Sequence, residues 1–298
     1  MGRRWVVATL LPLCACGAQL GDGPGDASQN NNPDSPLTPN VDGSPDGRTM
    51  LGPWGTATKV TGASDAALDE DDVVISANEL ELYFKKSNGT DVDLYVMTRT
   101  STGMPFGAPS AITTLNSTAG EESPRLADND LTIYFGRGGD IYKATRASVN
   151  TQTWSTPSPV AAFNTGANEK WAVVCSNGYA MVSRANGTNG QDLYEGNVAT
   201  TVNTLVTQLN TTTNEQGNFL TSDCLTLYFQ SNRTNDQYDI YESTRTTTSS
   251  AWSNPTAISD FNTATLNEED GWLSPSQRTF AYASNAANNQ KDVYISTR

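Results

Sequence analysis

Carboxylate side chains are the residues of this chain whose types and spacing could support chemistry. Five glutamates recur at similar intervals, at Glu70, Glu121, Glu169, Glu215 and Glu268. Further acids stand beside three of them, in the runs 69–72, 121–122 and 268–270. Clustered carboxylates can bind a hard cation such as Ca²⁺. Two carboxylates on opposite sides of a glycosidic bond can also serve as acid and base, or as nucleophile.

Each repeated glutamate opens a longer pattern, which indicates the elements that would position the carboxylates. The centre of an apolar strand follows thirteen residues later, as in Leu82-Tyr83-Phe84 and Leu227-Tyr228-Phe229. An Asp–apolar–Tyr triplet comes next, and its tyrosines are Tyr95, Tyr142, Tyr194, Tyr241 and Tyr294, which lie 47, 52, 47 and 53 residues apart. A period of this length means that one supersecondary unit is stacked on copies of itself.

The second copy indicates how one unit folds. A first strand leads on from Glu121, and strand-like runs rich in β-branched and aromatic residues cover 131–135 and 140–146. A fourth strand is expected from Trp154 to near Phe163. Four short strands joined by tight turns and repeated radially form the blade of a β-propeller.

The two ends of the pattern complement each other. The fifth copy stops after its third strand, whereas residues 53–62 carry a spare outer-strand pattern around Trp54. We therefore predict an all-β fold in which residues 51–298 form a five-bladed β-propeller of four-stranded blades. The N-terminal strand completes the last blade and closes the ring. An open solenoid is the competing arrangement.

Composition excludes several classes of function. The chain has 298 residues, a formal net charge of −14 and no histidine. An acidic surface argues against nucleic acid as a partner. The lack of histidine removes the commonest general base and the commonest zinc ligand. We expect a monomer without a metal or cofactor, with a structural Ca²⁺ on the carboxylates as the alternative.

The N-terminus has the pattern of an export signal: a positive start, a short apolar run, and then small residues with cysteine. Leu13-Cys14-Ala15-Cys16 resembles the lipobox of bacterial lipoproteins. The resemblance implies a signal peptide over 1–16, a lipid on Cys16 and a protein anchored extracytoplasmically in a bacterial outer membrane. Residues 17–50, rich in Gly, Pro, Asp and Asn, predict a disordered linker. An ordinary signal peptide cut near Ala18 is the alternative.

The blade pattern as a whole resembles the WD-like repeats of TolB-type propellers. It consists of Glu, a turn with Asp or Asn, then Leu-Tyr-Phe and Asp-Ile-Tyr, and it covers residues 53–298. The third copy departs most, because Val182-Ser183 replaces the Tyr-Phe of other copies. The resemblance implies an extracytoplasmic scaffold of the kind found in bacterial surface lipoproteins. It implies no catalytic residues, because propellers host many unrelated functions.

A residue type that recurs in every copy is first expected to have a structural role in the blade. For the glutamates, one such role is pairing across blades with the arginines of the repeated Thr-Arg pairs. The functional alternative is a channel mouth, acidic on the side of copies one, two and five and aromatic or basic elsewhere, which would suit sugar rings. The predicted mouth residues are Glu70, Asp71, Glu121, Glu122, Lys170, Trp171, Glu215, Glu268, Glu269 and Trp272.

The cysteines beyond the leader, Cys175 and Cys224, fall near the first turn of adjacent copies. Export to an oxidising compartment would allow a disulfide between blades. Two separate buried thiols are the alternative, and the sequence leaves both open.

The leading functional hypothesis is a membrane-anchored, non-catalytic propeller that binds a protein or a glycan. One alternative is a glycoside hydrolase, since five-bladed propellers include such enzymes. Against it, no isolated Asp or Glu trio lies in apolar sequence, where raised pKa values are expected. A second alternative is a subunit of a cell-envelope assembly, by resemblance to TolB-type propellers.

Overall fold

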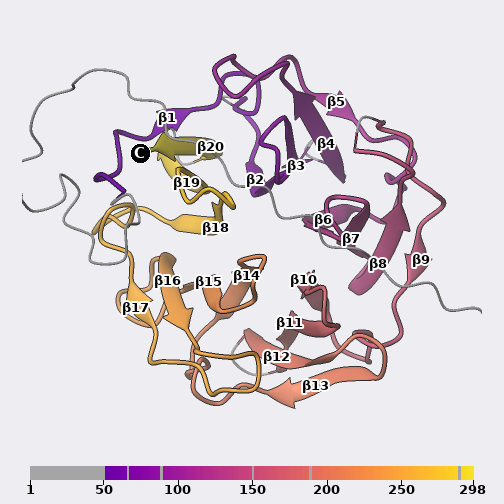
Figure 1. The fold of residues 1–298 in the computed structure, drawn as a ribbon, viewed down its shortest axis with the longest axis vertical. Coiled ribbons are helices and arrows are strands. Elements are labelled where there is room, and N and C mark those ends of the chain that lie inside the picture. The colour runs from indigo at the N-terminus through magenta and orange to yellow at the C-terminus, as the bar shows by residue number, and fades with distance from the viewer. Residues whose placement is uncertain (1–50, 66, 88–89, 150, 188–189, 288–289) are drawn as a thin grey trace, which may run out of the picture. The chain divides into compact units, whose positions relative to one another are not determined.

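A computed structural model describes residues 51–65, 67–87, 90–149, 151–187, 190–287 and 290–298. The predicted signal peptide, the lipidation site Cys16 and the linker lie outside these residues. Residues 51–298 form a compact unit of five antiparallel four-stranded sheets set around a ring (Figure 1). The prediction of an all-β, five-bladed propeller is confirmed.

Blades one to four follow the chain from the innermost to the outermost strand, whereas blade five takes its outermost strand from the N-terminal side. Blade one contains β2 (Glu70–Ile75), β3 (Glu81–Ser87), β4 (Val92–Thr98) and β5 (Ser110–Ala111). Blade two contains β6 (Glu121–Ala127), β7 (Thr132–Arg137), β8 (Asp140–Thr145) and β9 (Ser158–Pro159). Blade three contains β10 (Glu169–Val174), β11 (Tyr179–Ala185), β12 (Gln191–Asn197) and β13 (Thr201–Leu205). Blade four contains β14 (Glu215–Leu220), β15 (Thr226–Ser231), β16 (Asp239–Thr244) and β17 (Thr256–Ala257). Blade five contains β18 (Glu268–Leu273), β19 (Thr279–Ala287), β20 (Gln290–Thr297) and β1 (Thr58–Lys59).

The ring closes as predicted, because β1 from the N-terminal side is the outer strand of the last blade. Lys59 lies opposite Tyr294 in the antiparallel pair of β1 and β20. The Gly55 N–H donates to the Thr297 carbonyl at 2.9 Å. Pairing the two ends of the chain in one sheet leaves only short edges exposed.

The outer strands are shorter than the sequence predicts. The strand expected from Trp154 to near Phe163 contains only two paired residues, Ser158 and Pro159. The outer strands of blades one and four are equally short, at Ser110–Ala111 and Thr256–Ala257. Trp154 instead packs inward, at 3 % exposure, under the guanidinium of Arg146 at 4.7 Å. The same stacking of a Thr-Arg arginine on an outer aromatic ring recurs at Arg99 on Phe106, Arg245 on Trp252 and Arg298 on Trp54.

Apolar side chains fill the spaces between neighbouring sheets. One buried cluster joins Val74 and Phe84 of blade one to Phe135 of blade two and Trp272 of blade five. This burial between blades is what orders the inner strands around the axis. Among the residues described, no helix has the length and apolarity needed to cross a membrane.

Every innermost strand carries a β-bulge at the second residue after its repeated glutamate. The pairing register shifts there in all five blades. The bulged residues have positive φ angles, at Asp72 (57°), Ser123 (58°), Trp171 (49°), Gly217 (66°) and Asp270 (58°). A bulge redirects the side chains around it. Because the bulge occurs at the same position in all five blades, equivalent residues of the five inner strands lie at the same level along the ring axis.

Candidate functional site

The repeated glutamates are buried inside their own blades. Glu121 accepts hydrogen bonds from the Ser117 backbone N–H at 2.7 Å and pairs with Arg137 Nε at 2.8 Å. The same two contacts recur at Glu169 with Thr165 and Arg184 of the second strand. They recur at Glu215 with Thr211 and with Arg233, which lies just after the second strand. These arginines belong to the same blade as their glutamates. The predicted pairing across blades with the Thr-Arg arginines is therefore wrong.

Glu70 and Glu268 occupy the equivalent place in blades one and five. Glu70 accepts the Asp65 N–H at 2.9 Å, and Glu268 accepts the Thr263 N–H at 3.0 Å. Burial raises the pKa of both carboxyls. Four of the predicted mouth residues, Glu70, Glu121, Glu215 and Glu268, thus hold connecting loops to the inner strands and are at most 1 % exposed.

The residues directly after these glutamates do gather around the axis. Lys291 Nζ lies between two of them, 3.1 Å from Asp71 Oδ2 and 3.0 Å from Glu269 Oε2. Lys85 pairs with Asp71 at 2.8 Å. Burial raises the pKa of Glu269. Burial alone would lower the pKa of Lys291, but the charges of Asp71 and Glu269 raise it. Two carboxylates from neighbouring blades are therefore held together by a cation between them.

Two further predicted residues form an ion pair at the same level. Lys170 Nζ lies 2.9 Å from Glu122 Oε2, and both side chains are a quarter exposed. The Lys170 ammonium also lies 5.7 Å from the centre of the Trp171 ring. Of the predicted mouth, this pair is the part that remains open to solvent.

The bulged residues, one position further along each inner strand, form a second and buried layer around the axis. Asp72 accepts hydrogen bonds from the Ser123 N–H at 2.9 Å and from Trp171 Nε1 at 2.8 Å. Asp270 accepts the Asp72 N–H at 3.0 Å, and its own N–H donates to Gln230 Oε1 at 2.8 Å. These four bonds join all five blades. The layer therefore ties together the inner strands of blades one, two, three and five and β15 of blade four.

The two aspartates of this layer differ in their affinity for protons. Burial alone would raise the pKa of Asp72, but the charges of Lys85 and Arg125 and the Ser123 N–H outweigh it and hold the pKa at about 2. Burial and the charge of Asp72 raise the pKa of Asp270 well above its usual value. Neighbouring acids with pKa values pushed apart are the arrangement from which enzymes obtain a base and an acid.

A pocket of about 760 Å³ opens on the axis at the C-terminal ends of the inner strands, and we call it the axial pocket. The fourth residue after each repeated glutamate lines it: Val74, Arg125, Val173, Phe219 and Trp272. Turns between first and second strands add residues 128–131 and 221–224. The lining of this pocket presents about as much polar as apolar surface. Small-molecule sites combine a concave apolar wall with convergent polar groups.

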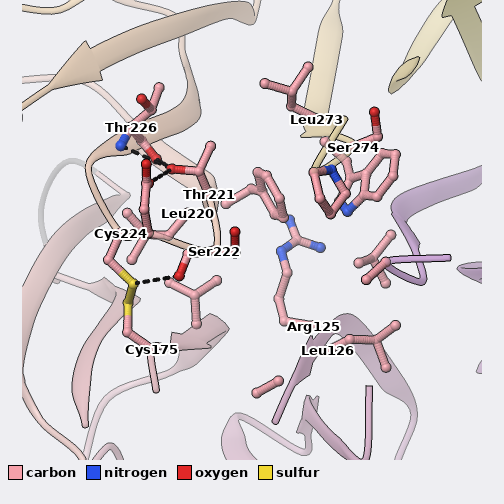
Figure 2. A pocket seen from close by; sticks show the side chains of 18 of the residues that line it. Arg125, Leu126, Cys175, Leu220, Thr221, Ser222, Cys224, Thr226, Leu273 and Ser274 are labelled. Atoms are coloured by element: carbon pink, nitrogen blue, oxygen red, sulfur yellow. Dashed lines mark hydrogen bonds between the residues drawn. A yellow bond between two sulfur atoms is a disulfide. The ribbon is translucent and has the colours of Figure 1, made fainter. Parts of the chain in front are cut away.

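Arg125 supplies a buried charge to the wall of the axial pocket. Figure 2 shows its guanidinium in the middle of the pocket, between Leu220 and Ser274. The side chain is 2 % exposed. Nε donates to the Asn218 carbonyl at 3.0 Å and Nη1 to the Pro124 carbonyl at 2.8 Å. Nη2 lies 3.6 Å from Asp270 Oδ1 and forms a buried ion pair with that carboxylate.

One rim turn has a strained backbone. Asp128, Asn129 and Asp130 have φ angles of 52°, 55° and 65° in succession. Asp and Asn tolerate this left-handed region better than most residues, but three in a row are uncommon. Strain of this kind persists where the surrounding structure enforces it, often at ligand-binding sites.

The predicted cysteines form a disulfide at the rim of the axial pocket. Cys175 and Cys224 have their Cα atoms 6.3 Å apart and join blade three to blade four (Figure 2). No group of three or more His, Cys, Asp or Glu side chains in the described ranges could hold a metal ion. The alternative of a structural Ca²⁺ gains no support from this geometry.

Sequence reasoning named Trp272 but missed Arg125 as a site residue. The repeat did contain a signal for it. At the fourth position after the glutamate four copies carry an apolar residue, whereas the second copy carries the charged residue Arg125. A repeat position that departs from its copies in one blade is where a ring of similar blades can build an asymmetric site.

Comparisons with known proteins support the fold. No family model matches the sequence, and no curated protein does. Among solved structures, the chain is similar to an α-L-arabinofuranosidase from Podospora anserina in complex with cellotriose, with a TM-score of 0.58 and 10 % identity over 83 % of this chain and 96 % of that one. It is similar to an endo-arabinase from Bacteroides thetaiotaomicron, with a TM-score of 0.56 and 11 % identity over 80 % and 96 %. A putative TolB from Agrobacterium tumefaciens gives 0.50 and 13 % over 80 % and 82 %. At these identities the likeness establishes a shared propeller fold.

Proposed function

We propose that this protein is a lipid-anchored, extracytoplasmic propeller that binds a carbohydrate chain in the axial pocket without cleaving it. The pocket combines the half-buried ring of Phe219 with hydroxyl and carboxylate groups on its rim, and Trp272, 3 % exposed, packs against Phe219 with ring centres 6.1 Å apart. Aromatic faces beside polar groups suit sugars, which have both apolar faces and hydroxyl edges. A similar propeller carries cellotriose in its solved structure.

The position of Lys291 is the observation that favours binding over hydrolysis. A glycosidase needs the scissile bond between its paired carboxyl groups. Between Asp71 and Glu269 that place is taken by the Lys291 ammonium, 3.1 and 3.0 Å from the two carboxylates. The deeper pair, Asp72 and Asp270, is 1 % exposed. Neither pair offers room for a glycosidic oxygen.

Glycoside hydrolysis is the second candidate, and the raised pKa of Glu269 favours it. A buried carboxyl with a raised pKa can protonate a leaving group near neutral pH. The similar solved structures include an arabinofuranosidase and an endo-arabinase. In this alternative Glu269 is the acid, and Lys291 moves away when substrate arrives.

Calorimetric titration of the purified protein with arabino-, xylo- and cello-oligosaccharides tests the proposal, with chromatography of the same mixtures for products. We expect binding without products, and a Kd about tenfold higher in Phe219→Ala, because aromatic contacts in binding sites are commonly worth more than 1 kcal/mol. Met104→Ala, an exposed residue outside the axial pocket, is the matched control. Products that disappear in Glu269→Gln would establish the second candidate. Failure of all three saccharide classes to bind would refute both.

The anchor has a separate test. We expect the N-terminal peptide of the mature protein to begin at Cys16 and to carry the mass of acyl chains. Several chains give durable membrane attachment, whereas one does not. Cys16→Ser should release the protein from the membrane fraction. An unmodified peptide that starts beyond Cys16 would show that the protein is not lipid-anchored.

A further inference from the structure

We propose that Glu242 and Arg298 bind two adjacent hydroxyl groups of a neutral sugar unit in a side arm of the axial pocket. This inference rests on the proposed function and names the chemical groups that the pocket recognises. Its basis is an acid and an arginine that line the same pocket without forming an ion pair with each other.

The side arm extends from the ring axis into the space between blades four and five. Most of the pocket lining comes from first strands and the turns after them, and Arg298, directly after β20, adds to it. Among the described residues, blade four alone also contributes its second and third strands, through Thr226 and Tyr228 of β15 and Glu242 of β16. Tyr228 packs against Phe280 of blade five, with ring centres 5.6 Å apart, which places the arm between these two blades.

Glu242 has a carboxylate oxygen available to a ligand. Its Oε2 accepts a hydrogen bond from the Tyr228 hydroxyl at 2.8 Å, which holds the carboxylate in place. The side chain is partly exposed, and within the described ranges it has no other hydrogen bond and no ion pair. The equivalent Glu195 of blade three differs, because it accepts bonds from the Tyr179 hydroxyl and from Trp252 Nε1 and lies outside the pocket lining.

Arg298 supplies hydrogen-bond donors to the same arm. Its guanidinium stacks on the Trp54 ring at 4.1 Å, and Nε donates to the Gln277 carbonyl at 2.7 Å. Neither Nη1 nor Nη2 has a hydrogen bond or an ion pair to another residue that the structure describes. Between blades one and two, the equivalent Arg146 instead pairs with Glu81 at 2.6 Å. Donors that are fixed in advance lose little conformational entropy when a ligand binds.

The two charges act on one point of the arm, the Tyr228 hydroxyl. Burial raises the pKa of Tyr228, the charge of Glu242 raises it further, and the charge of Arg298 lowers it. An acceptor and a donor therefore lie near the same hydroxyl, yet they are too far apart to pair directly. A ligand that carries both kinds of hydrogen-bonding group can bridge them.

Adjacent hydroxyl groups of a neutral sugar have the chemistry that this arrangement requires. One hydroxyl can donate to Glu242 while its neighbour accepts from Arg298. The acid and the arginine add no net charge, so the arm favours neither an anion nor a cation. The exposed rim acids Asp128 and Asp223 disfavour an anionic sugar. A neutral saccharide therefore matches the arm best.

Calorimetry with three neutral probes (arabinotriose, xylotriose and cellotriose), an acidic one (trigalacturonate) and a zwitterion (L-alanine) tests the inference. Glu242→Gln removes the charge but keeps an acceptor for the Tyr228 hydroxyl, and Arg298→Lys keeps the charge but removes the planar fork of donors. For the tightest neutral probe we expect each change to raise Kd about 10- to 100-fold. Trigalacturonate and L-alanine should bind more weakly than that probe.

Matched controls come from equivalent positions outside the pocket lining. Glu195→Gln changes an acid that also accepts from a tyrosine hydroxyl. Arg99→Lys changes an arginine that stacks on Phe106 as Arg298 stacks on Trp54. We expect both controls to bind the neutral probe with the Kd of wild type.

A crystal structure of the wild-type protein with the same neutral probe provides a readout that needs no variant. We expect two adjacent sugar oxygens, one within about 3.2 Å of the Glu242 carboxylate and one within about 3.2 Å of an Arg298 Nη atom. The inference would be overturned, while the proposed function stands, by an unchanged Kd in either pocket variant, an equal rise in its control, tighter binding of trigalacturonate or L-alanine, or sugar oxygens placed elsewhere. Absence of binding by every neutral probe would remove both.

Discussion

Replacement of Trp54 by alanine tests whether pairing of the two chain ends stabilises the whole ring. Trp54 precedes β1 and packs against blade five, with ring centres 5.4 Å from Phe261 and 5.9 Å from Phe280. The Arg298 guanidinium lies 4.1 Å from its ring centre. Its partners therefore come from the loop after β17, from β19 and from the end of β20.

The expected loss follows from these contacts. Truncating a fully buried tryptophan costs about 3–5 kcal/mol. Trp54 is only half-buried, so its loss of apolar contact is smaller. Aromatic pairs and a cation–π contact add roughly 0.5–1.5 kcal/mol each. We expect Trp54→Ala to lower the free energy of unfolding by about 2–3 kcal/mol, and the midpoint temperature by about 5–10 °C in a domain of this size.

Calorimetric melting and urea unfolding measure this effect. Trp252→Ala removes the equivalent, 3 % exposed tryptophan of blade four and should cost more, whereas Met104→Ala, at 53 % exposure, should change stability by less than about 0.5 kcal/mol. A single transition shifted as a whole is expected, because the ring unfolds cooperatively. A Trp54→Ala protein that melts within about 1 °C of wild type, while Trp252→Ala is destabilised, would show that closure contributes no stability.

Three further changes test the layers of the structure. The pKa of Asp72 is lowered from its usual value of 3.8, so the ionised carboxylate stabilises the fold above pH 3.8, and this stability is lost as the pH falls through about 2. Asp72→Asn should remove about 2 kcal/mol of this dependence of the unfolding free energy on pH. Equal slopes of unfolding free energy against pH below 4 in wild type and variant would contradict the assignment. The disulfide joins residues 49 positions apart in the sequence. The double change Cys175→Ser with Cys224→Ser should lower the free energy of unfolding in urea by about 2–4 kcal/mol. A reductant should cause the same loss in wild type and no further loss in the variant. Gly217 has a φ of 66° at its bulge, where an added Cβ would meet the buried side chain of Gln230. Gly217→Ala should therefore lower the free energy of unfolding by about 1–3 kcal/mol. Gly103→Ala, with open space around the added Cβ, should lower it by less than about 1 kcal/mol.

Much of the architecture could be predicted from the sequence because a propeller repeats its local physics. The apolar strand centres, the Asp–apolar–Tyr triplets and the turns recur in each copy, so one blade predicts the others. The spare pattern around Trp54 predicted closure, and β1 pairs with β20. The short outer strands were harder to predict, because an aromatic residue such as Trp154 can either extend a strand or pack inward beside it.

The candidate site depends on features that the sequence did not reveal. The bulges arise from strand pairing, and they decide which side chain of each inner strand faces the axis. The repeat pattern alone does not distinguish Glu121 from Glu122 as a mouth residue, although Glu121 is buried inside its blade. The pairing of Lys291 with Asp71 also joins positions 220 residues apart, which no local pattern records.

The sequence by itself determined the blade, the number of blades and the closure of the ring, because these follow from periodic patterns of apolar and turn residues. Only the tertiary structure decided which carboxylates meet a cation, which pair of acids lies buried and where a pocket opens. Those properties depend on distances between different blades, and such distances exist only once the ring has formed. Arg125 is the clearest case: its neighbours in the chain are ordinary strand residues, and its buried ion pair with Asp270 of blade five forms only when the inner strands surround the axis.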